Sequence, residues 1–315
     1  MSVDEDLIAA RSAEPRKVTK SPFGPDDEIG MLSLMTPESR SAVMAEADAA
    51  TMFDLSVEFF QGMPSWTAGG DPPYQIWMTH TPRGQVVDNR RAGGPDYNFM
   101  EYSGDSFSMY THCGTHIDTL NHYGYDGQIW NCFSVAEDFG ARHWHVCGAE
   151  KHPPIIARGV LLDVPRALGM DRLPPSYGIS ANDVRATLAR QGTELQVGDV
   201  VLVRTGQMGA WPDADAYLTN EPGLNLESAK LLAEAGAIVI GADNVGLEQL
   251  PSAEPDHWVP VHTYLLAEAG VAIMEVVNCD EIADAELYEF AFFAATIKLR
   301  GATGAPLRPV VFPLR

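Results

Sequence analysis

Short apolar runs alternate with amphipathic segments through the second half of the chain. Runs rich in β-branched residues predict buried strands, and apolar residues that recur at helical spacing predict helices. The expected strands cover residues 159–164, 200–205, 238–241, 271–277, 288–298 and 308–312. The expected helices cover residues 180–191, 225–235 and 262–269. Strands that alternate with helices are typical of an α/β architecture.

Residues that favour helix ends mark where these helices begin and stop. Ser180 is expected to cap the helix 180–191, with Asp183 at the third helical position as a carboxylate variant of the capping box. Gly236 and Gly270 are expected to end the two later helices, because glycine readily adopts the left-handed backbone found there.

The first half of the chain is less regular. Thr36 before Pro37 predicts a helix over 37–49, because threonine caps a helix and proline fits its first turn. A strand is expected over 53–60. The loop that follows is rich in glycine and proline and carries Trp66, an aromatic side chain available for packing or for binding a substrate.

Two irregular insertions and a polar N-terminus interrupt the pattern. Residues 83–98 look like an insertion or a lid, and residues 123–155 form a second insertion. Residues 1–21 lack periodicity and are expected to form a flexible N-terminal arm. No repeat or low-complexity linker divides the remainder, so 22–315 is predicted to be a single domain.

The charge balance excludes several classes of partner. The chain has 43 acidic and 21 basic residues and a net charge of −22. Such a surface repels nucleic acid and anionic lipid, so neither is an expected partner. No apolar run approaches the roughly 18 residues of a membrane span, and the acidic N-terminus does not resemble a signal peptide. We therefore expect a cytoplasmic protein, a homodimer or homotetramer, that acts on a small molecule.

The richest chemistry lies in the stretch HCGTHIDTLNH at 112–122. It holds three of the nine histidines, His112, His116 and His122, together with Asp118. All four have even numbers, so an extended segment would present them on one face. In a helix His112 and His116 would stack, but Asp118 would point elsewhere. An extended metal-binding segment is the better interpretation.

A bend is needed for the first two histidines to share an ion. Four residues of straight strand span roughly 13 Å, whereas both imidazoles must lie about 2 Å from a zinc-like ion. Gly114 stands midway, where the missing Cβ permits a sharp turn. The sequence therefore predicts a metal-binding turn followed by a strand.

Other cysteines and histidines are weaker candidates. The four cysteines show no CxxC spacing and are expected to be buried thiols. Cys113 lies within the motif, but its odd number places it on the opposite face, so it is not assigned as a ligand. His143 and His145 flank Trp144 at alternate spacing, and histidines beside tryptophan often pack at interfaces instead of holding a metal.

The motif HCGTHIDTLNH resembles the HxGTHxDxxxH signature of the cyclase-family metal hydrolases, which include kynurenine formamidase, isatin hydrolase and cyclic imide hydrolase. The stretches SPFGPDDEIGMLSLMTPE, FDLSVEFFQGMPSW, GVLLDV, GDVVLVRTG, VPVHTYLLAEAGVAIMEVVN and GATGAPLRPVV are also similar to that family, in the same order. The resemblance covers about residues 22 to 313. It implies the swivelling β/β/α fold, a curved mixed sheet with helices on its outside.

The resemblance also implies the ligands and their roles. His112, His116 and Asp118 would form the first metal site, and Asp118 would bridge to a second ion held by His262 and Glu275. The metal would be zinc or manganese, as one or two ions per subunit. Glu275 also interrupts the apolar strand AIMEVV, where an ionised group needs a partner such as a metal.

The implied reaction is hydrolysis of an amide, imide or lactone C–N or C–O bond of a cyclic or aryl substrate. A metal-bound hydroxide would attack the polarised carbonyl. His122 matches the catalytic histidine of the family, the general acid or base. Trp66 matches the aromatic position of the substrate loop and would hold a flat substrate.

Departures from the family pattern bear on the substrate. Shorter members often have HxDxPxH, whereas this chain has Thr119 and Leu120 and lacks the proline. The insertions at 83–98 and 123–155 would also reshape the pocket. A cyclic imide, a lactone or a related ring amide is therefore as good a candidate as a kynurenine derivative.

Two other functions fit parts of the motif. His116, Asp118 and His262 could form the iron triad of a non-haem oxygenase, which predicts an all-β jelly roll and an arginine soon after the distal histidine. The next arginine is Arg300, and His112 would have no role. The third possibility is a non-catalytic metal-binding protein on the cyclase fold.

Overall fold

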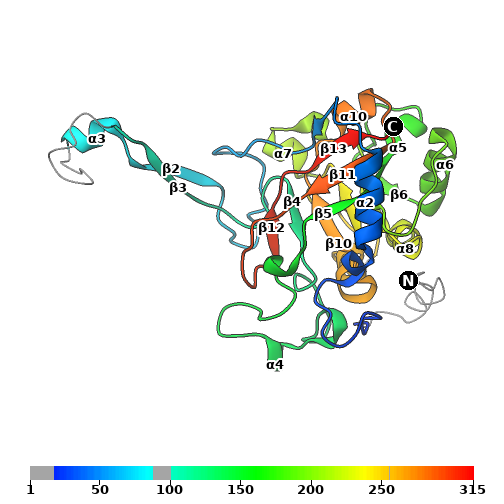
Figure 1. Cartoon of the computed structure of the whole chain (residues 1–315), viewed down its shortest axis with the longest axis horizontal. Coiled ribbons are helices and arrows are strands. Elements are labelled where there is room, and N and C mark those ends of the chain that lie inside the picture. The colour runs from blue at the N-terminus through cyan, green and yellow to red at the C-terminus, as the bar shows by residue number, and fades with distance from the viewer. Residues whose placement is uncertain (1–17, 88–100, 255) are drawn as a thin grey trace.

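A strongly curved mixed sheet forms the centre of the computed structural model, which describes residues 18–87, 101–254 and 256–315 (Figure 1). In the described chain the sheet has nine strands in the order β1-β13-β11-β5-β7-β9-β10-β4-β12. Its strands are β1 (Phe53–Asp54), β4 (His116–Asp118), β5 (Ile155–Asp163), β7 (Val200–Arg204), β9 (Val239–Ala242), β10 (Ala272–Glu275), β11 (Glu289–Ala294), β12 (Gly304–Pro306) and β13 (Val310–Pro313).

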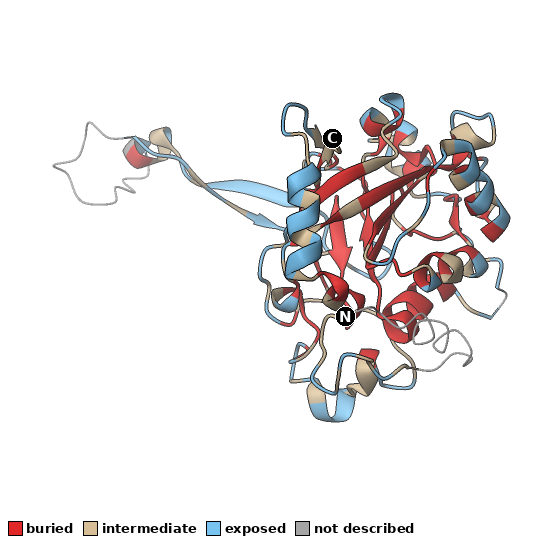
Figure 2. Cartoon of the chain, turned by 45° about the vertical axis from the view of Figure 1, so that its right-hand side comes forward, coloured by how far each residue is buried: buried red, intermediate tan, exposed pale blue. Residues whose placement is uncertain are grey.

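The middle of the sheet is parallel and its two ends are antiparallel. β5, β7, β9 and β10 run parallel to one another. Their side chains are almost all buried, as expected for parallel strands covered on both faces (Figure 2). β4 pairs antiparallel with β10 on one side and with β12 on the other. This arrangement confirms the predicted curved α/β sheet and contradicts the jelly roll expected of an oxygenase.

Helices cover the outside of the sheet. The α-helices are α2 (Pro37–Glu46), α3 (Pro82–Val87), α4 (Val135–Asp138), α5 (Val164–Ala167), α6 (Ala181–Gln191), α7 (Ala214–Tyr217), α8 (Leu226–Glu234), α9 (Pro260–Thr263) and α10 (Asp280–Asp284). Short 3-10 turns are η1 (Gly30–Leu34), η3 (Trp130–Cys132), η4 (Ala149–Lys151) and η5 (Gln207–Ala210), and η6 (Tyr264–Ala269) is a π-helix that continues α9. α2 packs on β5 and β11, whereas α6 contacts β5 and α8.

The predicted helix ends agree with the structure. The Thr36 side chain accepts a hydrogen bond from the Ser39 amide at the start of α2. Ser180 and Asp183 form the reciprocal capping box of α6. Gly236 and Gly270 both have positive φ angles just beyond α8 and η6. The sequence therefore predicted these ends, whereas the helix expected over 37–49 stops earlier, at Glu46.

Several predicted boundaries were wrong. The strand expected over 53–60 ends at Asp54, because the chain then leaves the sheet and the Val57 amide donates to the Thr115 hydroxyl. The strand expected over 288–298 ends at Ala294. β12 was not predicted. Cys132 is only half-buried, whereas Cys113, Cys147 and Cys279 are buried free thiols, as predicted.

A two-stranded hairpin projects from the body of the molecule (Figure 1). It consists of β2 (Gln75–His80) and β3 (Gly104–Ser108), and α3 lies at its far end. Residues 83–87 of the predicted insertion therefore extend away from the sheet and do not form a lid over it, while 88–98 lie outside the described residues. The hairpin exposes large apolar side chains, namely Ile76, Trp77, Met78 and Phe107.

The remaining described segments are a small second sheet and an irregular insertion. A second small sheet pairs β6 (Gly178–Ile179) with β8 (Gly223–Leu224). The insertion 123–155 contains only short helical turns before β5 begins, and His143 and His145 are exposed. Residues 1–17 of the expected N-terminal arm lie outside the described residues. No helix in the described chain is long and apolar enough to cross a membrane.

His152 predicts a pH effect on folding stability. It is 4% exposed, and neither ring nitrogen has a hydrogen-bond partner among the described residues. Burial lowers its pKa to about 4 in the folded protein, whereas the pKa of an unfolded histidine is about 6.5. Between about pH 6.5 and pH 4 the unfolded chain therefore binds more protons than the folded one. Stability must therefore fall as the pH falls through that window.

When the pH is lowered from 7.5 to 5, we expect the free energy of unfolding to fall by about 2 kcal/mol more in wild type than in His152→Leu. Urea unfolding of the metal-free protein at both pH values measures the difference between wild type and variant. His143→Leu, at an exposed position, is the matched control and should leave the pH dependence unchanged. Equal pH dependence in wild type and His152→Leu would contradict the prediction.

Candidate metal centre

The pairing of β4 with β10 builds the base of the site. In this antiparallel pair His116 lies opposite Glu275, and Asp118 lies opposite Ile273. Paired residues and residues two apart share a face of a sheet, so His116, Asp118 and Glu275 project together. Ile117 points to the other face and is fully buried in the core.

Gly114 makes the turn that brings His112 back to this face. Its φ angle is +62°, in the left-handed region. A Cβ at this position would lie 2.6 Å from the Phe59 ring. Both the backbone angle and the close ring therefore favour glycine, as the predicted bend requires. Only 116–118 are strand, and the residues before them form the turn.

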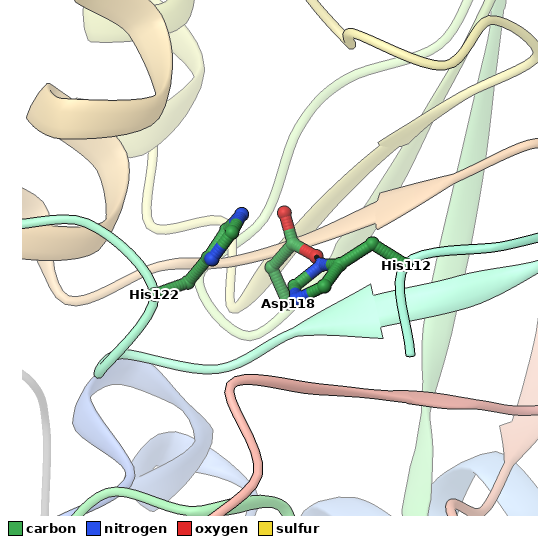
Figure 3. Close-up of side chains that lie close together, drawn as sticks. All are labelled: His112, Asp118 and His122. Atoms are coloured by element: carbon green, nitrogen blue, oxygen red, sulfur yellow. Dashed lines mark hydrogen bonds and ion pairs between the residues drawn. The ribbon is translucent and has the colours of Figure 1, made fainter. Parts of the chain in front are cut away.

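His112, Asp118 and His122 converge on one point (Figure 3). His112 Nδ1 lies 2.6 Å from Asp118 Oδ1, and its Nε2 lies 2.9 Å from the Thr303 hydroxyl. The His122 ring stacks on the His112 ring with centroids 3.9 Å apart. One ligand atom from each of the three residues lies within 4.8 Å of the others.

A second set of ligand atoms lies on the other side of Asp118. His116 Nε2 lies 3.1 Å from Glu275 Oε2 and 3.3 Å from Asp118 Oδ1. His262 Nε2 lies 3.1 Å from Glu275 Oε1 and 3.8 Å from Asp118 Oδ2. The six residues predicted from the sequence thus form one cluster, in which Asp118 belongs to both sets. The division of ligands between one or two ions stays a prediction.

Two atoms in the centre of the cluster lack hydrogen-bond partners. His116 Nε2 and Asp118 Oδ2 are both buried and make no hydrogen bond among the described residues, although ion-pair contacts surround both atoms. An unpaired nitrogen and a carboxylate oxygen in a dry site are costly unless a ligand satisfies them. Imidazole nitrogen and carboxylate oxygen are the donors that zinc and manganese accept. The residues present therefore fit a divalent metal ion.

The acids of the cluster attract positive charge. Burial lowers the pKa of His116, but its contacts with Asp118 and Glu275 outweigh burial and raise it to about 10. Burial and the nearby His112 lower the pKa of His122 well below its usual value. The acids of the cluster therefore favour positive charge at His116, whereas His122 stays neutral.

Glu248 is a site residue that the sequence analysis missed. It is 1% exposed, and its Oε1 lies 2.7 Å from His262 Nδ1. The same carboxylate accepts hydrogen bonds from the backbone amides of Val261 and His262. With Nδ1 protonated and donating to Glu248, the Nε2 lone pair of His262 faces the cluster. An acid in the apolar run VGLEQL was the available signal, of the same kind as Glu275 in AIMEVV.

A pocket opens above the cluster. Its polar end is formed by His112, His122, His262 and Glu275, and its other lining residues are Trp66, Tyr110, Tyr123, Glu221, Val245, Gly246, Leu250, Trp258 and Val259. Trp66 and Trp258 lie against each other with ring centroids 5.5 Å apart. The structure therefore places Trp66 in the wall of the pocket, with Trp258 as a second indole that the sequence analysis missed.

Comparison with known proteins places this chain in a family. The family model described as "Putative cyclase" matches residues 53–249. The chain belongs to the cyclase family. A crystal structure of a novel cyclase is 27% identical, with a TM-score of 0.83, and the match covers 94% of this chain and 100% of that one. No curated protein matches this cyclase-family sequence significantly.

More distant structures share the cyclase fold. Isatin hydrolase A from Ralstonia solanacearum is 20% identical with a TM-score of 0.62, over 84% of this chain and 92% of that one. A predicted metal-dependent hydrolase from Bacillus stearothermophilus is 22% identical with a TM-score of 0.53, over 83% and 98% of the two chains. At these identities the likeness supports the shared fold, and the hydrolase activities are those of the two named proteins.

We expect Glu248→Gln to weaken binding of zinc or manganese by about 10- to 100-fold, the usual effect of losing a residue that orients a metal-bound histidine. The amide has one acceptor atom where the carboxylate has two, so it cannot serve both backbone amides and His262. Chelator competition on the metal-free protein measures the affinity. Glu227→Gln, at an exposed position of α8, is the control and should bind metal as wild type does. Wild-type affinity in Glu248→Gln would contradict the orienting role.

Proposed function

We propose that this cyclase-family protein is a metal-dependent hydrolase that opens an amide, imide or lactone bond of a small cyclic or aryl substrate. The observation that carries the proposal is the buried pair His116 Nε2 and Asp118 Oδ2, which make no hydrogen bond among the described residues. The two residues contact His112 and Glu275, which line a pocket with aromatic walls. The pair fits a cation, and the walls fit a flat molecule.

The proposed ligands of the metal are His112, His116, Asp118, His262 and Glu275. A divalent ion in this cluster would polarise a carbonyl group and favour deprotonation of water near neutral pH. We propose zinc or manganese, because both accept imidazole and carboxylate donors. The side chains around the pocket would orient the substrate and transfer the proton.

His122 is proposed to move the proton. Its ring lies against His112 and lines the pocket, so it is within reach of a bound substrate. As a general acid or base it would take a proton from the attacking water and deliver it to the leaving nitrogen or oxygen. Trp66 and Trp258 would hold a planar substrate with its carbonyl toward the histidines.

Two structural neighbours were solved with a bound organic molecule. One isatin hydrolase in the comparison was solved with the product analogue thioisatinate, and another with benzyl benzoate. Both names denote aromatic compounds. The similarity of 18% in sequence carries the fold only, so the ring preference of this chain rests on its own aromatic pocket.

A substrate panel tests the function. Purified metal-free protein is supplied with zinc or with manganese and assayed against formanilides, isatins, cyclic imides and lactones. We expect hydrolysis of at least one ring substrate, which chelation abolishes and metal restores. Metal binding without hydrolysis of any member of the panel would instead indicate a non-catalytic metal-binding protein.

We expect His122→Ala to lower turnover by about 100- to 10,000-fold while the metal content stays near that of wild type, since the variant loses only proton transfer. Elemental analysis and steady-state kinetics measure the two quantities. His116→Ala is the comparison variant and should lose metal together with activity. If His122→Ala also loses its metal in step with activity, His122 is a ligand and the proposed proton transfer is wrong.

A further inference from the structure

Glu221 is a buried acid in the pocket wall that the proposed reaction does not use. It lies between α7 and β8 and is 3% exposed. It lines the pocket together with the histidines of the metal centre. A carboxylate is seldom buried without a reason, because leaving water costs it several kcal/mol unless a partner compensates.

The two oxygens of Glu221 have different surroundings. Oε2 accepts hydrogen bonds from the backbone amides of Val245, at 2.8 Å, and Gly246, at 3.1 Å. Oε1 has no hydrogen-bond partner among the described residues. Since one oxygen is fixed by the loop after β9 and the residue lines the pocket, the other is free to accept a hydrogen bond from a bound molecule.

The pocket wall contains acidic side chains and no lysine or arginine among its described residues. Its two carboxylates are Glu221 and Glu275. Glu275 is already engaged with His116 and His262. Glu221 is therefore the lining carboxylate that is left to contact a substrate. Burial raises its pKa to about 7, and the two backbone amides oppose this rise, so a hydrogen-bond donor from a substrate would stabilise the ionised form.

We propose that Glu221 Oε1 accepts a hydrogen bond from a substrate N–H group, so that the pocket prefers uncharged ring amides and imides that carry a free N–H. This inference rests on the proposed function, which identifies the substrate as a ring that the protein opens by hydrolysis. It narrows the substrate class from amides, imides and lactones to N–H-bearing lactams and imides. A lactone or an N-alkylated ring has no N–H at the scissile bond and leaves the carboxylate unpaired.

Glu221→Gln tests the proposal with little change of shape. The Val245 and Gly246 amides require an oxygen, so the glutamine NH₂ must take the place of Oε1. The variant thus keeps both backbone hydrogen bonds and replaces an acceptor by a donor in the pocket wall. Glu227→Gln, an exposed glutamate on α8, is the matched control. Unchanged metal content and thermal unfolding confirm that Glu221→Gln is folded.

The probes are pairs that differ only in the N–H group: isatin and N-methylisatin, phthalimide and N-methylphthalimide, and succinimide and N-methylsuccinimide. Calorimetric titration of the metal-loaded protein measures the binding of compounds that it does not hydrolyse, and kcat/KM measures the turnover of those that it does. We expect wild type and Glu227→Gln to prefer the N–H member of at least one pair by about 10- to 100-fold. Glu221→Gln should lose that preference.

Three results would overturn the proposal. In the first, wild type binds both members of each pair equally. In the second, it binds no member of any pair. In the third, the preference for the N–H member persists in Glu221→Gln. Hydrolysis of any panel member in these cases would leave the proposed function standing while removing the role of Glu221. Conversely, selective binding of the N–H member without any hydrolysis would support Glu221 and contradict the proposed reaction.

Discussion

Buried negative charge that requires a buried cation is the constraint on which the site depends. Asp118, Glu248 and Glu275 are each exposed by 4% or less, and isolated carboxylates in such surroundings are strongly unfavourable. His116 and His262 lie between these acids and offer nitrogen atoms toward the same point. A divalent ion bound among them would offset the charge of the carboxylates and accept the lone pairs of the unprotonated nitrogens.

The sheet fixes this cluster through its register. His116 and Asp118 face the site because β4 pairs with β10 so that His116 lies opposite Glu275. A shift of one residue would turn both ligands to the other face and bring Ile117 into the site. β12 holds β4 from the other side, with Gly304 opposite Asp118. The three-residue strand β4 is thus held on both edges, which allows such a short strand to position ligands accurately.

The local part of this arrangement could be predicted from the sequence. Alternate spacing of His116 and Asp118 and the glycine at 114 predicted a shared face and a bend, and both are present. The extended segment expected over all four ligands was wrong, because only 116–118 are strand, and His112 lies in a turn and His122 in a bend. The resemblance to the cyclase family supplied His262 and Glu275, which spacing alone could not connect to a motif far earlier in the chain. Boundaries such as 53–60 failed because tertiary contacts, here the hydrogen bond from Val57 to Thr115, ended the strand.

The roles of Glu248 and Glu221 could not be predicted from the sequence, because each is a single acid whose role depends on distant backbone amides. Glu248 acts through Val261 and His262, and Glu221 is fixed by Val245 and Gly246. No spacing relates either glutamate to these partners. Only the folded loops after β9 bring them together, at the edge of the sheet where parallel strands end and where α/β proteins usually bind ligands.

The buried acids at this edge differ in how fully their oxygens are used. Asp243 accepts from the Thr205 amide and hydroxyl with one oxygen and from the Gly206 amide with the other. Glu248 likewise uses both oxygens, for two backbone amides and His262. Carboxylates saturated in this way hold the protein's own segments and have little capacity left for a ligand. Glu221 has the same burial but only one oxygen engaged within the described chain, so the remaining acceptor is the part of this acidic edge that a substrate can use.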